Sequence, residues 1–165
     1  MRFTDSLGIR TIVLNVALAA VYFLSAKGVS FLSLTDEGNV FVVWPPTGIA
    51  LAALLIFGAR ASIGIFFGAL LLNASIVSIP LSIQTAIGNT LGPLLSFYLL
   101  GRFNHKQNFM LSLDGINMFF ISVLFGSLVT SSNGVLALFA WGALPSEVAW
   151  GTVWYVWCVG DLIGF

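Results

Sequence analysis

The chain contains very little charge. Only 7% of its 165 residues are Asp, Glu, Lys or Arg, whereas a soluble domain carries about 25%. Its six basic and six acidic side chains give a formal net charge of zero. This balance excludes the positively charged surface with which proteins bind nucleic acid, so we expect no nucleic-acid partner.

The chain is also poor in the residues that build catalytic and metal sites. Cys158 is the one cysteine, so no internal disulfide can form. His105 is the one histidine, and it cannot by itself supply a Cys/His metal site or a Ser/His/Asp set. No phosphate-binding glycine loop is present. We therefore expect no catalytic residue, no metal and no cofactor.

Hydrophobic residues are abundant instead. They make up 59% of the chain, with 15 Phe and 5 Trp, and the mean hydropathy is +1.05. The long apolar runs lack the alternation of a β-barrel, which predicts a helical protein embedded in the lipid bilayer. The expected fold class is all-α, a polytopic membrane helical bundle in one domain, residues 1–165. About six transmembrane spans are expected: Ile12–Leu32, Val40–Phe57, Ala61–Ile79, Leu81–Leu100, Ile116–Asn133 and Val148–Phe165.

The placement of basic residues predicts the orientation of these spans. If the N-terminus lies in the cytoplasm, five of the six basic residues lie there too: Arg2, Arg10, Arg60, Arg102 and Lys106. Lys27 alone falls on the outer side, together with Asp36, Glu37 and Glu147. This is the bias that the positive-inside rule describes, and six spans place the C-terminus in the cytoplasm as well.

The second segment begins with Trp44-Pro45-Pro46-Thr47-Gly48, which cannot be fully helical. A residue before proline is disfavoured in the α conformation, so Pro45 is expected to be extended and the helix to begin at about Pro46. From there to Gly58 a helix is about 20 Å long, and a bilayer core needs roughly 30 Å. The sequence therefore predicts a broken second span, in which non-helical chain lines a pocket. The alternative is a proline kink with no ligand.

The run from Ile116 to Trp141 is too long for one untilted span, because its helix would be about 39 Å long. Ser131-Ser132-Asn133-Gly134 is the natural break within it. We expect one helix to end there. A short re-entrant or interfacial piece, 135–144, is expected to follow and to stop at Pro145.

Among the residues of the predicted spans, Asp161 has the highest free-energy cost of membrane insertion, because a carboxylate within a span costs about 2.5–3.5 kcal/mol on insertion scales. Trp150, Trp154, Trp157 and Asp161 share one helical stripe. One interpretation is an aromatic-walled cavity with the acid at its inner end. The other is a belt of interfacial tryptophans, with Asp161 at the inner membrane rim.

Amides and small residues complete the pattern. Asn89 and Thr90 form a polar pair in the fourth segment, whereas Asn73 and Gln84 suit simple hydrogen bonds between helices. Glycine pairs spaced by four residues predict close approach of helix backbones. The pattern is also compatible with a homodimer. The pairs are Gly64/Gly68, Gly88/Gly92 and Gly160/Gly164.

Five motifs, in this order along the chain, resemble one known family. They are Val43-Trp44-Pro45-Pro46-Thr47-Gly48-Ile49-Ala50, Gly58-Ala59-Arg60, Gly68-Ala69 with Asn73, Ala86-Ile87-Gly88-Asn89-Thr90-Leu91, and Val159-Gly160-Asp161 with Gly164. The set resembles the bacterial membrane-associated sensor domain of the first type. The resemblance implies a multi-pass, all-helical input module of the inner membrane, at the N-terminus of histidine kinases and diguanylate cyclases.

The resemblance further implies a C-terminal cytoplasmic output domain, within two-component or cyclic di-GMP signalling. Members usually have further spans after the Gly-Asp element, so we expect this chain to be either part of a longer protein or a minimal relative. Members also often carry an acidic residue where Gly92-Pro93 stands here. A charge role at that point is therefore not expected in this chain.

The leading hypothesis is a sensory input domain that detects an unknown ligand or membrane state. Trp44, Thr47, Asn89 and Asp161 are expected to line or gate its pocket. Further candidates for a pocket or signalling role are Pro45, Pro46, Thr90 and Trp157. The alternative is a small transporter or channel subunit, because broken helices and a membrane acid also suit solute or proton passage. Solute flux in liposomes that contain only this polypeptide would favour transport. A third possibility, a scaffold for a partner membrane protein, is tested by co-purification.

Overall fold

The computed structural model describes residues 2–32, 43–103, 112–144 and 149–165. Within these residues the fold is all-α, as the sequence predicts, and contains no strand. The elements are α1 (Arg2–Leu32), α2 (Pro45–Phe57), the 3-10 turn η1 (Ala59–Ala61), α3 (Ser62–Ala74), α4 (Ile79–Phe103), α5 (Leu113–Ala140) and α6 (Trp150–Gly164).

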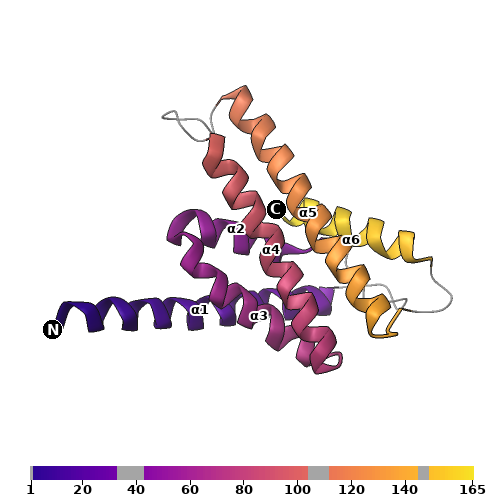
Figure 1. The fold of residues 1–165 in the computed structure, drawn as a ribbon, viewed down its shortest axis with the longest axis horizontal. Coiled ribbons are helices and arrows are strands. Elements are labelled where there is room, and N and C mark those ends of the chain that lie inside the picture. The colour runs from indigo at the N-terminus through magenta and orange to yellow at the C-terminus, as the bar shows by residue number, and fades with distance from the viewer. Residues whose placement is uncertain (1, 33–42, 104–111, 145–148) are drawn as a thin grey trace.

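The helices form one bundle around α4. Figure 1 shows α4 and α5 running antiparallel and side by side, and they make the most extensive helix pair. Helix α3 packs between α1 and α4, and α6 packs against α5. Helix α2 contacts α1, α4 and α6, so it links the first helix of the chain to the last one.

Two helical stretches of the described residues are long and apolar enough to cross a membrane, Gly8–Val29 and Leu113–Ala140. Helices α2 and α3 have 13 residues each. At about 1.5 Å per residue such a helix is roughly 20 Å long, shorter than a bilayer core of roughly 30 Å. Six complete spans therefore stay a prediction.

The distribution of side chains is that of a protein surrounded by lipid. Buried positions between the helices carry small and polar residues, among them Ser82, Ser96, Ser122, Ser127 and Ser131. Small residues and hydroxyls are the usual contents of helix interfaces in membranes. The large apolar side chains that face outward include Ile12, Val16, Leu24, Ile56, Phe67, Leu71, Phe120, Leu136 and Phe139.

Helix α2 begins one residue earlier than predicted. Trp44 is the N-cap, with φ −120° and ψ 77°, and Pro45 and Pro46 are the first two helical residues. The prediction that Pro45 is extended is therefore wrong. The restriction on a residue before proline is met by Trp44, while both prolines stand in the first turn, where a missing N–H leaves no hydrogen bond unmade. Residues 40–42 lie outside the described part of the chain.

The predicted third segment, Ala61–Ile79, is also corrected. Helix α3 ends at Ala74, because the backbone N–H groups of Ser75, Ile76 and Val77 turn back onto the carbonyls of Leu72 and Asn73. The Ser75 hydroxyl donates to the Leu72 carbonyl at 2.6 Å and completes this cap. The chain then turns directly into α4. The first segment, in contrast, is longer than predicted, because α1 already begins at Arg2.

The predicted break at Ser131–Gly134 is wrong, because α5 continues unbroken from Leu113 to Ala140. The serine hydroxyl groups form hydrogen bonds to carbonyls of the same helix. Ser127 donates to the Val123 carbonyl at 2.9 Å, and Ser131 donates to the Ser127 carbonyl at 2.8 Å. Asn133 donates to the Gln84 carbonyl of α4 at 2.7 Å. A polar stretch that usually marks a turn therefore serves here as the packing face of a long helix, and no re-entrant piece forms over 135–140.

The glycines of two predicted pairs lie where helix backbones meet. A Cβ atom on Gly64 or Gly68 would come within 3.0 Å of α1, at Asn15 and Ala19 respectively. On α4, a Cβ at Gly88 would meet the Asn133 side chain, and one at Gly92 the Thr130 hydroxyl. Contacts within one chain occupy these surfaces, so the pairs on α3 and α4 give no support to a homodimer.

Asn15 of α1 holds the start of α3 in place. Its side-chain oxygen accepts a hydrogen bond from the backbone N–H of Gly64 at 2.6 Å, and its amide donates to the Thr11 carbonyl at 2.9 Å. The Gly64 N–H lies in the first turn of α3, where backbone donors have no partner within the helix. Asn15 therefore acts as a cap supplied by a neighbouring helix.

We expect Asn15→Ala to lower the free energy of unfolding by about 1–3 kcal/mol, because it leaves the buried Gly64 N–H without an acceptor. Unfolding by SDS in mixed micelles measures this change. Asn117→Ala is the matched control, since Asn117 is an exposed residue of α5. Equal losses in the two variants would contradict the capping role.

Candidate functional site

The N-terminus of α2 meets the last turns of α6 in a buried junction. The Trp44 N–H donates to the Gly160 carbonyl at 3.0 Å, so the non-helical residue before the prolines is bonded directly to the α6 backbone. The Trp44 carbonyl accepts from the Thr47 N–H at 3.1 Å and so begins the helix. Figure 1 places the end of α6, marked C, near the middle of the bundle beside α2.

A side-chain hydrogen bond joins the same two helices. The Thr47 hydroxyl donates to the Oδ1 atom of Asp161 at 2.7 Å. Thr47 is 3% exposed and Asp161 is completely buried. The residues are 114 positions apart in the chain, so only the tertiary fold brings this hydroxyl and carboxyl group together.

Glycines allow the backbones of α2 and α6 to approach this closely. A Cβ atom at Gly48 would collide with the Gly164 carbonyl, and a Cβ at Gly164 would collide with the Trp44 carbonyl. The two helices therefore touch through their main chains around the Thr47–Asp161 bond. No side chain separates them at this point.

Two further helices contribute polar side chains to the junction. Tyr22 of α1 is 1% exposed, and its hydroxyl is within hydrogen-bonding reach of the Trp44 and Asn89 side chains. The same hydroxyl lies in the electrostatic field of Asp161. We call the five residues Tyr22, Trp44, Thr47, Asn89 and Asp161 the junction cluster. It joins α1, α2, α4 and α6 at one place.

The junction cluster contains acceptor atoms that receive no hydrogen bond. Asp161 Oδ2 and Asn89 Oδ1 are buried and have no hydrogen-bond partner among the residues that the structure describes. Pro45 and Pro46 lack the N–H groups that the first turn of a helix usually offers to a carboxylate. The Thr47 N–H is bonded to Trp44. The double proline thus leaves Asp161 facing a helix start from which it receives one hydrogen bond, through the Thr47 side chain.

The electrostatic balance at Asp161 is unfavourable for a bare charge. No basic side chain of the described segments interacts electrostatically with this carboxyl group. The polar or titratable side chains that do interact with it are Thr47, Tyr22 and Cys158. A helix N-terminus stabilises an anion by roughly 0.3–2 kcal/mol. Removing an unpaired carboxylate from water costs several kcal/mol. The desolvation cost is the larger of these two energies, so the start of α2 alone does not compensate an ionised Asp161.

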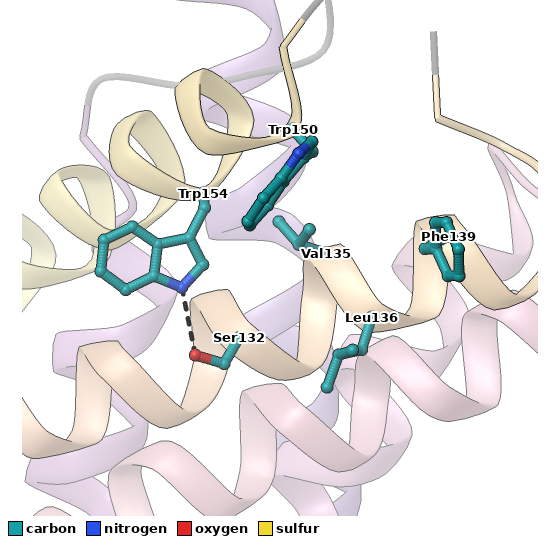
Figure 2. Close-up of a pocket in the computed structure, with 6 residues that line it drawn as sticks. All are labelled: Ser132, Val135, Leu136, Phe139, Trp150 and Trp154. Atoms are coloured by element: carbon teal, nitrogen blue, oxygen red, sulfur yellow. Dashed lines mark hydrogen bonds between the residues drawn. The ribbon is translucent and has the colours of Figure 1, made fainter. Parts of the chain in front are cut away.

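A separate groove lies between α5 and α6. It has a volume of about 420 Å³ and is lined by Ser132, Val135, Leu136, Phe139, Trp150 and Trp154. Figure 2 shows Trp154 of α6 pointing to Ser132, to which its indole N–H donates at 3.1 Å. Asp161 is not among these lining residues. The tryptophans and the acid of the predicted stripe therefore do not share one cavity.

The remaining predicted site residues lie around the junction cluster rather than in it. The Thr90 hydroxyl donates to the Ala86 carbonyl of its own helix at 2.7 Å. The Trp157 ring covers Gly134 of α5, where a Cβ atom would lie about 2.5 Å from it. Gly160 contributes its carbonyl to Trp44. These are packing contacts, and a ligand or signalling role for Thr90 and Trp157 stays a prediction.

Sequence reasoning missed Tyr22 and Asn15. Both are isolated polar residues within the apolar run of the first segment. This isolation could have indicated that they form hydrogen bonds to other helices. Hydroxyl and amide groups inside a predicted span need partners, because lipid offers none. The identity of those partners depends on how α1 packs, which no local pattern specifies.

The fold and the junction define a helical, membrane-associated domain without recognisable catalytic machinery in its described residues. The MASE1 family model matches residues 14–165. The chain belongs to the MASE1 family, whose members are membrane-associated sensory domains. This confirms the resemblance that the sequence motifs predict. No match was found among the curated proteins or among the solved structures.

Proposed function

We propose that this chain is the sensory input domain of a bacterial inner-membrane receptor, and that the α2–α6 junction carries its signal. Membership of a sensory family supports the general role. The observation that carries the specific proposal is the buried Thr47–Asp161 bond between two helices whose backbones touch. A contact of this kind has few alternative packings, which suits a switch between two discrete states.

The proposed topology has about six spans, with the N-terminus in the cytoplasm and α6 running from the outer side toward the cytoplasm. Figure 1 supports a common side for the basic connections: the start of α1, the α2–α3 connection and the end of α4 all lie toward the left of the view. The connection holds Arg60 and the end of α4 holds Arg102. The end of α1, the α3–α4 turn and the start of α6 lie on the opposite side. Helices α2 and α6 are then the half-length helices that meet inside the membrane.

The proposed partner is a C-terminal cytoplasmic output domain, a histidine kinase or a diguanylate cyclase. Phe165 follows the junction directly, because Asp161 and Gly164 belong to the last turn of α6. A shift of α6 against α2 would therefore be passed to whatever segment follows in the full-length protein. The stimulus acts by binding one packing of the junction more tightly than the other.

The experiment compares Asp161→Asn and Thr47→Val with wild type in the full-length protein. We expect each variant to change kinase autophosphorylation or cyclic di-GMP synthesis by roughly 5-fold or more, the lower part of the usual range for allosteric coupling. Both changes disturb the same bond, so their effects should have the same sign. Membrane abundance is measured in parallel to separate signalling from loss of protein.

Asp114→Asn is the matched control. It removes the same charge from an exposed position in the first turn of α5, far along the chain from the junction. Its output should equal that of wild type. An unchanged output in both junction variants, at normal membrane abundance, would remove the Thr47–Asp161 bond from the signalling mechanism.

A further inference from the structure

The junction cluster lacks a positively charged partner for its buried oxygen atoms. Its two orphaned acceptors, Asp161 Oδ2 and Asn89 Oδ1, are both buried, with Asn89 6% exposed. Buried acceptors without partners are rare in proteins and call for an explanation. The cluster also holds a carboxyl group on which no basic side chain of the described chain acts. The cluster therefore lacks hydrogen-bond donors for two acceptors and lacks a positive charge to balance the carboxylate. A bound cation would supply both.

The size of the occupant is limited by the packing. The α2 and α6 backbones are in contact at Gly48 and Gly164, and Asp161 Oδ2 is itself buried. The groove between α5 and α6 has no lining residue in common with the cluster. No cavity of the described residues opens onto Asp161. The occupants that fit a buried carboxyl oxygen with the least change in packing are therefore the smallest positive charges, a proton or a bare monovalent ion.

We propose that the junction cluster is a binding site for one small monovalent cation, a proton or Na⁺, held by the Oδ2 atom of Asp161. As a proton site, the carboxyl group keeps its Oδ1 as the acceptor for Thr47 and gains a donor at Oδ2. As a Na⁺ site, the neutral oxygens of Asn89, Thr47 and Tyr22 are the available further ligands, since hard cations take oxygen ligands. The two occupants share one chemistry, neutralisation of a buried carboxylate by a single positive charge.

The groups that face Asp161 on each packed element agree with a single titrating acid. Tyr22 is the titratable group from α1, and Cys158 is the one from α6 itself. Helix α2 contributes Thr47, and α4 contributes Asn89, which Tyr22 links to the acid. Helix α5 also packs against α6; it contributes Ser131 beside Cys158, and none of its described residues is a titratable group that acts on Asp161. Cation binding would close the junction and its loss would open it, because an ionised carboxylate gains by reaching water. As a signal this step rests on the proposed function, whereas as a binding site it stands alone.

The test is infrared difference spectroscopy of the full chain in lipid nanodiscs, at a series of pH values, first in choline chloride and then with Na⁺ added. We expect the carbonyl stretch of a protonated carboxylic acid that is absent from Asp161→Asn and retained in Asp114→Asn. Thr47→Val keeps the acid but removes the hydrogen bond to Oδ1, so it should shift the band. This variant keeps the test valid if Asp161→Asn does not fold.

The outcomes distinguish the two cations. A band that weakens as the pH rises, equally with and without Na⁺, identifies the proton as the occupant. A band that is present in choline and disappears when Na⁺ is added at constant pH identifies Na⁺. An ionised Asp161 throughout, with no effect of Na⁺, would overturn the proposal and point to a water molecule between the two acceptors. Because no output is measured, this failure would leave the sensory proposal standing.

Discussion

Gly164→Val is expected to force α6 away from α2 and to lower the free energy of unfolding by about 1–3 kcal/mol, the usual cost of overpacking. The reason is that even the Cβ atom of the new side chain would collide with the Trp44 carbonyl, which is backbone and cannot rotate away. The same displacement breaks the Thr47–Asp161 bond. We therefore also expect Gly164→Val to change the output of the full-length protein in the direction of Asp161→Asn.

Gly151→Val is the control for this prediction. Gly151 lies in the same helix, and no atom lies within 4 Å of a Cβ built on it. SDS unfolding in mixed micelles should give this variant a stability close to that of wild type, or slightly higher, because valine has a better helix propensity than glycine. Equal stabilities of the two variants would mean that α2 and α6 are not in backbone contact.

Gly92→Val is expected to have the second large effect, because it separates α4 from α5. A Cβ atom at Gly92 would overlap the Thr130 hydroxyl and lie 2.7 Å from the Gly126 carbonyl. The α4–α5 pair is the most extensive in the bundle, so a shift there disturbs many contacts at once. We expect a loss of at least about 1–3 kcal/mol in the free energy of unfolding, together with lower abundance in the membrane.

Gly101→Val is the matched substitution on the same helix, since a Cβ there has no neighbour within 4 Å. The comparison of thermal unfolding midpoints in one detergent isolates the packing effect from the change in helix propensity. A Gly92→Val protein as stable as Gly101→Val would contradict the packing of α4 on α5. It would also weaken the explanation for the unbroken α5, in which Asn133 bonds to the Gln84 carbonyl of α4.

The parts of the fold that were predictable depend on local rules. Proline geometry placed the start of α2 to within one residue, because the missing N–H and the restricted φ are properties of the residue itself. Glycine spacing pointed to positions on α3 and α4 that the structure places against neighbouring backbones. For Asp161 the sequence left two interpretations open, an acid inside the bundle and an acid at the inner membrane rim, and the structure shows the residue completely buried.

The parts that were not predictable depend on partners distant in the chain. Ser131 to Gly134 has the composition of a turn, yet α5 runs through it, because Asn133 bonds to Gln84 and Trp157 packs on Gly134. Tertiary contacts overrode local preference there. The membership of Tyr22 in the junction cluster was invisible for the same reason, since it depends on where α1 crosses α2 and α4.

The central claim is that Thr47 and Asp161 join α2 to α6 and that this junction carries the signal. Thr47→Cys with Asp161→Cys in a Cys158→Ala background of the full-length protein tests it most directly, with Thr47→Cys and Asp114→Cys as the control pair. We predict that oxidation forms an intramolecular 47–161 disulfide, seen by peptide mass spectrometry, and that reduction changes the output. No disulfide at 47–161, or a disulfide whose reduction leaves the output unchanged, would contradict the account.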